Sequence, residues 1–488
     1  MGNARRFAMI PGPKPLPIIG NSWRFALGQK PWRTKSLDAT LWRLRELAGS
    51  GGAAKVAKLF GHPDLVFPFC AEETAKIYRR EDSLPYRAVA PCLKHYKQEL
   101  RKDFFGDEPG LIGVHGMPWS KFRSKVSKAL ASPEAARSAV PCLDYVAEDF
   151  VKKMESLLDE NSELPKDYLT ELYKWALESV GAWALGTRLG CLSNDDVAAK
   201  DIIRSIHGFF HSVPELELSA PLWRLYSTPA YKTYVDALDS FRSLCLKRLT
   251  DKGICASIAK VSGEKVATIL ALDLLLVGVD TTAAAAASTV YLLAKNERAQ
   301  RRLQGELDKN LPAGRILNSR DLDRLPYLRA CLKEALRIKP VILGNGRCIQ
   351  SDAVISGYEV PKGSHIVFPH YIMSNEERYF PSPEEYVPER WLRDAKHQSD
   401  TEPHTVDVCR RQRVVGIHPF ASLPFGFGRR MCIGKRFAEV ELQLLLAKIF
   451  HKYDVSWRHG ELTYSVTPTY IPNEPLQFTL KHRDKRCQ

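Results

Sequence analysis

A short loop around Cys432 constrains this chain more than any other stretch of it. Glycines stand at 426, 428 and 434 in the run PFGFGRRMCIG, which occupies 424–434. Glycine suits a backbone that turns tightly or passes close to a flat partner. Apolar residues recur at helical spacing over 435–450 and predict a helix there. A helix N-terminus lowers the pKa of a nearby thiol and favours the thiolate, which binds metal ions. We therefore expect a ligating thiolate; an inert cysteine in a structural loop is the alternative.

The loop matches a known signature, Phe-x-x-Gly-x-Arg-x-Cys-x-Gly, at five positions: Phe425, Gly428, Arg430, Cys432 and Gly434. It closely resembles the haem-binding signature of the cytochrome P-450 family. The resemblance implies haem b, iron protoporphyrin IX, with the Cys432 thiolate as the axial metal ligand and Phe425, Arg430 and Gly434 as cofactor-binding residues. The implied activity is that of a monooxygenase, which inserts one atom of O2 into a lipophilic substrate and reduces the other to water.

Length and composition favour one large domain. A chain of 488 residues suggests about three domains as a prior, but no Ser/Gly linker, long acidic run or repeat divides it. With 44% hydrophobic and 26% charged residues it can bury a sizeable core. We predict a mainly α fold with a small β lobe, and the resemblance implies the cytochrome P-450 fold around a buried haem over 11–488. The segment 1–10, with Arg5 and Arg6 and no acidic residue, fits the end of a transit segment.

The balance of charge favours an acidic partner. Lysine plus arginine exceed aspartate plus glutamate by 71 minus 56, a net charge of +15. An anionic membrane, an acidic redox protein and nucleic acid all fit that charge. The basic residues are spread along the chain without interleaved aromatics or a zinc-finger pattern, so we expect no nucleic-acid partner. Eleven cysteines, an odd number without a Cys-x-x-Cys pair, indicate a reducing compartment rather than a disulfide framework.

The first part of the chain predicts a small lobe. It has no 20-residue apolar anchor, which argues against a membrane-anchored enzyme of the endoplasmic reticulum. Prolines at 11, 13, 15 and 17 predict a stiff extended strip that resembles the hinge of the family. A helical pattern over 36–48 and a β-like one over 53–70 predict a helix that leads into a small sheet. The segment 85–116 is irregular and charged, and loops of that length are usually functional.

Trp119 and Arg123 follow Pro118, which can begin a helix, and lie at i and i+4 on one helix face. The pair resembles the Trp-x-x-x-Arg of the family, whose indole and guanidinium hold a haem propionate. The resemblance therefore implies that both residues bind the cofactor. An exposed amphipathic helix with an ordinary cation–π pair is the alternative.

The segment 266–294 is almost entirely apolar and long enough to cross a membrane. Its Asp273 and Asp280 argue against that, because an aspartate near the bilayer centre costs about 2.5–3.5 kcal/mol. We therefore predict a long helix buried in the core. Within it, Gly278 and a run of alanines provide a narrow surface that would let the helix approach a flat macrocycle.

The same helix carries an acid next to a hydroxyl. The run from Gly278 to Thr281 resembles the Ala/Gly-Gly-x-Asp/Glu-Thr motif of the family, in which these groups relay protons to dioxygen. The resemblance implies that Asp280 and Thr281 are catalytic. Val277 stands where the family has a small residue, which would tighten the pocket or displace water. An aspartate paired in the core and a threonine bonded to its own helix are the alternative.

Glu334 and Arg337 lie at i and i+3 in the helical segment 327–338, so they can form an ion pair. An isolated surface pair would contribute only a few tenths of a kcal/mol. Their spacing resembles the Glu-x-x-Arg of the family. With Arg390 downstream, the resemblance implies a buried structural network behind the cysteine loop.

Arg329 and Lys333 are four residues apart on the same helix and can share an exposed face. A solvated surface is the ordinary interpretation of such a pair. Animal mitochondrial members of the family use two basic residues at the matching positions to dock an acidic ferredoxin. Together with Lys435 and Arg436, they would frame a positive patch for an adrenodoxin-like 2Fe-2S ferredoxin.

The turn Gly344-Asn-Gly-Arg347 resembles arthropod mitochondrial members most closely. The resemblance implies that Arg347 holds a propionate, that 341–344 line the substrate pocket and that 202–238 correspond to the lid that touches substrate and membrane. Core packing explains the apolar residues of 202–238 equally well. The polar segment 394–417 predicts an exposed insertion, and 464–470 would add a hairpin tip to the pocket.

The motifs follow the family order from about 11 to 480. We expect an enzyme that hydroxylates a steroid, an ecdysteroid or a foreign compound with electrons from a ferredoxin. It would lie peripherally on the matrix side of the mitochondrial inner membrane. The alternatives are a microsomal-type enzyme of the endoplasmic reticulum served by a flavoprotein reductase, and a haem-binding sensor or lipid carrier without turnover.

Overall fold

The computed structural model of the chain describes residues 4–26, 31–32, 36–57, 59, 61–87, 89–193, 197–218, 220–311, 315–392 and 417–483. The predicted insertion at 394–417 lies outside these residues except for its last position. Nine cysteines fall within the described residues, and all nine are free thiols. Cys409 and Cys487 lie outside them. The absence of disulfides in the described part agrees with the prediction from cysteine spacing.

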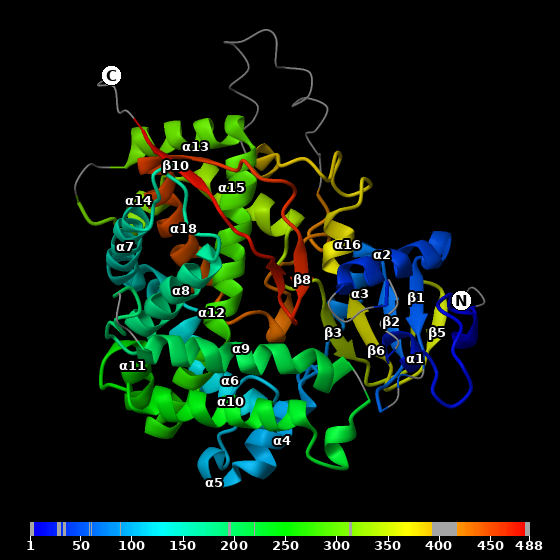
Figure 1. Cartoon of the computed structure of the whole chain (residues 1–488). Coiled ribbons are helices and arrows are strands. Elements are labelled where there is room, and N and C mark those ends of the chain that lie inside the picture. Colours follow the sequence, from blue (N-terminus) through cyan, green and yellow to red (C-terminus); the bar gives the residue numbers. More distant parts are fainter. Residues whose placement is uncertain are drawn as a thin grey trace.

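One helix, α12 (Glu264–Lys295), runs through the middle of the molecule (Figure 1). It is long and apolar enough to cross a membrane, with a mean hydropathy of 1.8 in its most apolar window, but 83% of that window is buried inside the protein. The helices α8 (Tyr168–Ala184), α11 (Gly253–Ser262) and α18 (Lys435–Lys452) pack against it. A helix that is apolar all round belongs in a core. The predicted core helix at 266–294 is thus confirmed.

Seven further helices surround α12: α6 (Gly116–Leu130), α7 (Pro133–Ser156), α9 (Val197–Leu218), α10 (Pro229–Leu246), α13 (Glu297–Asn310), α14 (Ser319–Asp323) and α15 (Pro326–Ile338). Two of them begin with a hydroxyl cap followed by proline. Ser132 accepts the N–H of Ala135 at the start of α7, and Thr228 accepts that of Tyr231 at the start of α10. These caps satisfy N–H groups that have no partner within the helix, so the starts are specified locally.

A small lobe holds most of the strands. Its main sheet has the order β1-β2-β6-β3, built from β1 (Ala53–Val56), β2 (Leu65–Pro68), β3 (Asn345–Cys348) and β6 (His365–Phe368). β2 and β6 are parallel, with Val66 opposite Ile366, and the other neighbours are antiparallel. The lobe also contains α1 (Ser22–Ala26), α2 (Leu37–Ala48), α3 (Ala71–Arg79), α16 (His370–Ser374) and the hairpin of β4 (Ala353–Ile355) and β5 (Tyr358–Val360). It lies beside the helical part and carries the N-terminus (Figure 1).

Two further pairs of antiparallel strands lie outside that sheet. β7 (Tyr453–Ser456) pairs with β10 (Thr479–His482), and β8 (Tyr464–Val466) pairs with β9 (Tyr470–Pro472). The second pair contains the predicted hairpin at 464–470. The fold is therefore mainly α with a small β lobe, as predicted.

The segment 85–116 departs from the prediction of an irregular loop. It contains α4 (Pro91–His95), a π-helical turn η4 (Tyr96–Leu100) and α5 (Lys102–Phe105). Lys97 Nζ lies 2.7 Å from Asp273 Oδ1 of α12, and both side chains are buried. The Leu111 N–H donates to Asp273 Oδ2 at 2.6 Å. The segment gains its order from these contacts with α12, which lie far away in the sequence and leave no local pattern.

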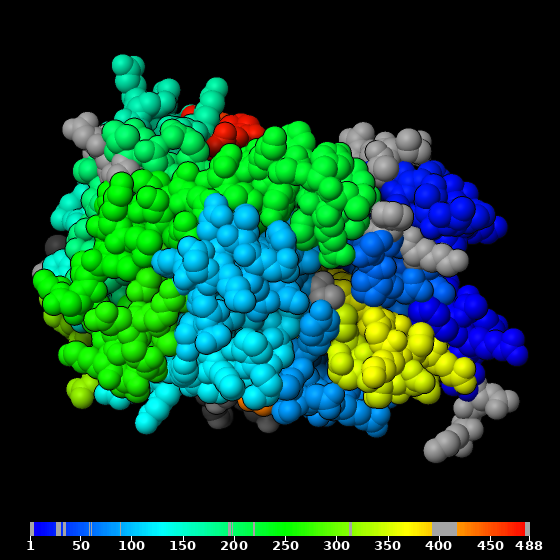
Figure 2. All heavy atoms as spheres, turned by 90° about the horizontal axis from the view of Figure 1, so that it is seen from below, coloured from blue at the N-terminus to red at the C-terminus, as the bar shows by residue number. Residues whose placement is uncertain are grey.

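Helices α9 to α11 cover the same face of the molecule as α4 and α5. Seen from below, the green surface of α9 to α11 adjoins the blue and cyan surface of 91–130, and the β lobe lies on the other side (Figure 2). Tyr96 and Arg101 both bond to Asp239 of α10, at 2.8 Å and 2.9 Å. The Cys92 N–H of α4 also donates to Glu217 Oε1 of α9 at 3.1 Å, so the predicted lid of 202–238 is bonded to the segment 85–116.

Gly278 packs against α8. A Cβ added to it would lie 2.9 Å from Cγ2 of Val180, so its small size serves contact between two helices. We expect Gly278→Ala to lower the free energy of unfolding by about 1–2 kcal/mol, because the core must shift to admit the methyl group. Gly305→Ala is the matched control, since a Cβ there meets nothing within 4 Å and alanine favours a helix by about 0.5–1 kcal/mol. Denaturant midpoints measure both; equal shifts would contradict the packing argument.

Candidate active site

The cysteine loop is a tight turn held by its own backbone. The Cys432 N–H donates to the carbonyl of Phe425 at 2.9 Å, and the Met431 N–H donates to that of Gly428 at 3.1 Å. Gly426 and Gly428 have φ of +71° and +74°, which residues with a Cβ rarely adopt. A Cβ on Gly428 would also lie 2.7 Å from the Glu81 carboxylate. Two of the three glycines are therefore required by the turn itself. Gly434 has an ordinary φ of −82°.

The thiol of Cys432 lies just before α18, which begins at Lys435. The side chain is accessible, although protein atoms lie closely around it. Burial raises the pKa of this thiol above its usual value, while the Gly434 N–H and the charges of Arg123 and Lys435 lower it. The prediction that the helix end would lower the pKa is therefore wrong for the net direction, because desolvation outweighs the nearby donors.

Arg430 reaches into the interior beside the loop. Its guanidinium lies 3.6 Å from the ring centroid of Trp119 and donates to the carbonyls of Pro85 at 3.1 Å and Val114 at 3.0 Å. Burial and the charges of nearby arginines lower its pKa to about 9. His115 lies against the same guanidinium at 3.4 Å, and burial with the Arg430 charge lowers the pKa of His115 to about 4. The region disfavours additional positive charge.

Arg123 joins the cysteine loop to α6. Its guanidinium donates to the carbonyl of Met431 at 3.1 Å. Burial lowers its pKa, and the attraction of the Cys432 thiolate raises it. Trp119, one helical turn earlier, is buried. The structure therefore brings the predicted pair Trp119 and Arg123 to one side of the loop, next to Arg430.

Arg347 and Arg87 complete a crowded group of guanidiniums. Arg347 forms an ion pair with Glu81 and donates to the carbonyl of Phe427 at 3.3 Å. Arg87 donates to Asn345 at 3.3 Å, but its buried Nε has no partner. Burial and the charge of Arg347 lower the pKa of Arg87 to about 10. Burying like charges together costs free energy unless anions offset it.

This group fits the two carboxylates of a haem. The charges of Arg87, Arg123 and Arg347 act on Arg430, and Arg123 also acts on the Cys432 thiol. Glu81 is the carboxylate that raises the pKa of Arg87 and Arg430. The unpartnered Nε of Arg87 is a donor that a further anion would satisfy. A cysteine thiol and a cluster of guanidiniums thus lie close together in the fold.

Asp280 and Thr281 lie on α12 and differ in their contacts. The Thr281 hydroxyl donates to the carbonyl of Val277 at 2.8 Å, and the residue is half-buried. Asp280 is only 1% exposed and accepts a hydrogen bond from the Thr469 hydroxyl. Burial raises the pKa of Asp280, whereas its bonds to Thr469 and Tyr173 and the charge of His211 lower it. The bond of Thr281 to its own helix is the arrangement expected under the structural alternative, but it leaves the hydroxyl oxygen free to accept.

A groove of about 390 Å³ lies beside the cysteine loop, on the side of α15 and α18. Arg329, Lys333 and Lys435 line it, whereas Arg436 does not. Arg329 also donates to the carbonyl of Leu322 at 2.7 Å, so part of its donor capacity is used within the protein. Glu439 lies in the same groove, 3.9 Å from Lys435. The structure therefore brings three of the four predicted docking residues together.

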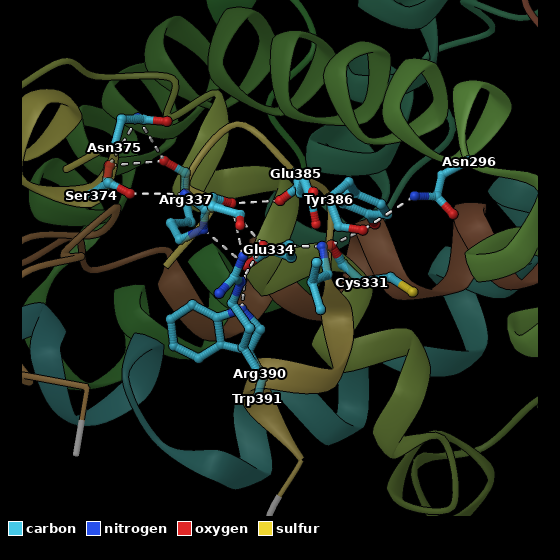
Figure 3. A network of polar contacts seen from close by, with 12 residues as sticks. Asn296, Cys331, Glu334, Arg337, Ser374, Asn375, Glu385, Tyr386, Arg390 and Trp391 are labelled. Atoms are coloured by element: carbon cyan, nitrogen blue, oxygen red, sulfur yellow. Dashed lines mark hydrogen bonds and ion pairs between the residues drawn. The ribbon is translucent and has the colours of Figure 1, made fainter. Parts of the chain in front are cut away.

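Glu334, Arg337 and Arg390 form a buried network (Figure 3). Arg337 donates to Glu334 through Nε at 3.0 Å and a terminal nitrogen at 2.8 Å, and Arg390 Nε donates to Glu334 at 3.2 Å. The side chains of all three are 0% exposed. Trp391 Nε1 adds a bond to Glu334 at 2.8 Å, and Arg337 also donates to the carbonyl of Ser374 at 2.9 Å. The network joins α15 to η6 (Pro388–Trp391) and to the end of α16.

Several residues of the site carry no signal in the sequence. Arg87 and His115 lie in the segment 85–116, where no motif singled them out. Tyr173 and Thr469 reach Asp280 from α8 and from the turn between β8 and β9. The contacts of these residues join segments far apart in the chain, and no periodicity within one segment encodes them.

Comparisons with known proteins agree with this site. A model of the family described as Cytochrome P450 matches residues 95–254 and 256–480. "Probable cytochrome P450 49a1" of Drosophila melanogaster is 49% identical over 503 residues, covering 99% of this chain and 84% of that protein. "Probable cytochrome P450 301a1, mitochondrial" of the same organism is 39% identical over 501 residues, covering 98% and 87%.

Among solved structures, a mutant heme domain of cytochrome P450DA superposes with a TM-score of 0.73, at 20% identity and with 97% of each chain covered. That likeness shows the fold. The chain belongs to the cytochrome P450 family. It is therefore a monooxygenase, and its family and fold carry haem ligated by a cysteine thiolate.

The buried network makes a prediction about stability. Glu334→Gln removes the charge that offsets Arg337 and Arg390, so we expect a loss of about 3 kcal/mol or more in the free energy of unfolding. The control is Glu297→Gln, which breaks an ion pair with Arg301 whose side chains are 76% and 73% exposed; it should change stability by less than about 0.5 kcal/mol. Denaturant midpoints compare the two variants. Similar losses in both would contradict the special role of the network.

Proposed function

We propose that this monooxygenase hydroxylates a lipophilic substrate with electrons from an acidic 2Fe-2S ferredoxin, at the matrix side of the mitochondrial inner membrane. The observation that carries the haem site is the group of guanidiniums beside Cys432. Iron bound by a cysteine thiolate supplies the chemistry of O2 activation. Cys432 would supply the thiolate ligand of the iron, and Trp119, Arg123, Arg347 and Arg430 would hold the haem carboxylates. Phe425 and Gly434 shape the loop around the thiolate.

Asp280 and Thr281 handle protons in this proposal. Asp280 is buried, and burial raises its pKa, which favours its holding a proton more than an exposed aspartate would. Thr281 uses its hydroxyl proton in the bond to the Val277 carbonyl, which leaves its oxygen as an acceptor. The two residues are consecutive on α12. In this proposal the acid supplies the proton, and the hydroxyl oxygen accepts a hydrogen bond along its path.

A lipophilic substrate and peripheral contact with a membrane are supported by the segment between α9 and α10. Leu225 is 81% exposed and Tyr226 58%, next to Leu222 at 42%. Large exposed apolar side chains in one short segment are typical of a surface that meets a membrane or a partner. A substrate that partitions into a membrane would reach the site from that side. Steroids, ecdysteroids and foreign compounds all have this property.

The electron donor is supported by the groove beside the cysteine loop. Arg329, Lys333 and Lys435 line it next to Phe425 of the loop, so an acidic protein docked there would lie close to the thiolate. The name of one relative, cytochrome P450 301a1, includes the word mitochondrial, and so does that of cytochrome P450 12b2. These names support a mitochondrial location with a ferredoxin donor. A microsomal-type enzyme served by a flavoprotein reductase is the alternative.

The axial ligand is tested by spectroscopy. The reduced carbon monoxide complex of the wild-type holoprotein should show the band of thiolate-ligated haem, and Cys432→Ser should lose it, because an alcohol replaces the thiolate donor. Cys70→Ser, a half-exposed cysteine in the small lobe, should keep the band. A band typical of histidine-ligated haem in the wild type would overturn the assignment of Cys432.

The electron donor is tested by charge reversal. Lys333→Glu places a negative charge in the groove, so the apparent KM for an adrenodoxin-like ferredoxin should rise about tenfold at low salt. Lys260→Glu, on the exposed face of α11, reverses the same charge outside the groove and should leave this KM unchanged. Both are measured by NADPH consumption with ferredoxin and its reductase. Turnover only with the flavoprotein reductase would instead support the microsomal alternative.

A further inference from the structure

The carboxylate of Asp280 is fixed by groups from outside its own helix. The Thr469 hydroxyl donates to Asp280 Oδ2 at 2.5 Å, and both residues are 1% exposed. The Tyr173 hydroxyl of α8 bonds to the same carboxylate. His211 of α9 is exposed, and its charge acts on Asp280. A carboxylate removed from water depends on such donors for its charged form.

Thr469 belongs to the turn between β8 and β9, and this turn is tied to a second segment near the site. The Tyr470 N–H donates to the carbonyl of Val341 at 2.7 Å, at the start of the segment 341–344. Within the turn, the Thr467 N–H donates to the carbonyl of Thr469 at 2.9 Å. The rings of Tyr464 and Tyr470 stack across the hairpin with centroids 4.7 Å apart. The position of the Thr469 hydroxyl is therefore set by a braced hairpin.

We propose that Thr469 is a positioning residue, which orients the Asp280 carboxylate and sets its affinity for protons. In this proposal, the turn between β8 and β9 takes part in proton transfer as well as lining the site. This inference rests on the proposed role of Asp280 in proton transfer. It adds a residue that lies 189 positions away in the sequence and belongs to no motif.

The physical consequence concerns the protonation of Asp280. A hydroxyl that donates to a carboxylate stabilises the charged form, so its removal raises the pKa of the acid. The described titratable groups that face Asp280 are Tyr173 and His211, and Glu474 in turn acts on Tyr173. Tyr173 and His211 remain when Thr469 is changed. We therefore expect the pH at which Asp280 takes up a proton to rise by about one unit in Thr469→Val.

The test compares Thr469→Val and Thr469→Ala, which remove the hydroxyl, with Thr469→Ser, which keeps it. Infrared spectra of the ferric holoprotein, recorded at a series of pH values, follow the carbonyl bands of protonated carboxyl groups. The band that is absent from the spectra of Asp280→Asn is assigned to Asp280. The same variants are assayed for hydrogen peroxide released per NADPH consumed with the ferredoxin pair. Thr467→Val is the matched control, because it changes the same side chain in the same turn without removing a partner of Asp280.

For the valine and alanine variants, we expect the titration of Asp280 to shift upward by about one pH unit. The pH dependence of the peroxide ratio, which is the hydrogen peroxide released per NADPH consumed, should shift by the same amount. Serine should restore both, and Thr467→Val should match the wild type. Combining Thr469→Val with Asp280→Asn should add nothing to the peroxide ratio of Asp280→Asn alone.

Two different failures are distinguishable. A wild-type titration in Thr469→Val or Thr469→Ala, while Asp280→Asn changes the peroxide ratio, overturns the role of Thr469 and leaves the proposed function standing. An effect of Thr469→Val that adds in full to that of Asp280→Asn also overturns it, because the residue would then act on structure alone. A wild-type ratio and pH profile in Asp280→Asn overturns the proton role of Asp280 itself.

Discussion

Four guanidinium groups share the interior beside the cysteine loop, and their mutual repulsion is the constraint on which the site depends. Arg87, Arg123, Arg347 and Arg430 are partly stripped of water, and burial with mutual repulsion lowers the pKa of Arg430 to about 9. Backbone carbonyls of Pro85, Val114 and Met431 solvate some of the donors. Neutral carbonyls cannot cancel the charge, so the arrangement favours a cofactor that brings carboxylates of its own. The positive charge of these arginines therefore favours a cofactor that carries carboxylates.

Holding like charges together requires a rigid frame, and the buried network behind the loop provides one. Glu334 accepts bonds from two arginines and from Trp391, so its carboxylate joins α15 to η6, and Arg337 extends the link to the carbonyl of Ser374 at the end of α16. α12 and α18 pack against each other across the site. The rings of Trp183 and Phe437, stacked 4.1 Å apart, fix α18 against α8 as well. The loop that carries Cys432 is therefore held at its C-terminal end by α18, and the network fixes α15, which packs against α18.

The parts of this fold that could be predicted are those whose signal lies within a few residues. Helix caps, the apolar run of α12 and pairs such as Trp119 with Arg123 depend on local spacing. The helical turns of 85–116 could not be predicted, because contacts with α12 stabilise them. Thr469 reaches Asp280 from another element, and no period in either segment reports that contact. For Cys432 the sequence indicated the helix end that lowers the pKa, but burial, which acts in the opposite direction, depends on the whole fold.

The ion pair of Lys97 and Asp273 limits which substitutions the segment 85–116 can accept. Both charges are buried, and a Cβ on Gly110 would lie 2.4 Å from the Asp273 carboxylate. Replacing either charge alone would leave the other without a counter-ion in the core, a change that usually costs several kcal/mol. Lys97, Gly110 and Asp273 can therefore change only in concert. A chimaera that takes this segment from a relative would keep its stability only where the residues at all three positions are exchanged together.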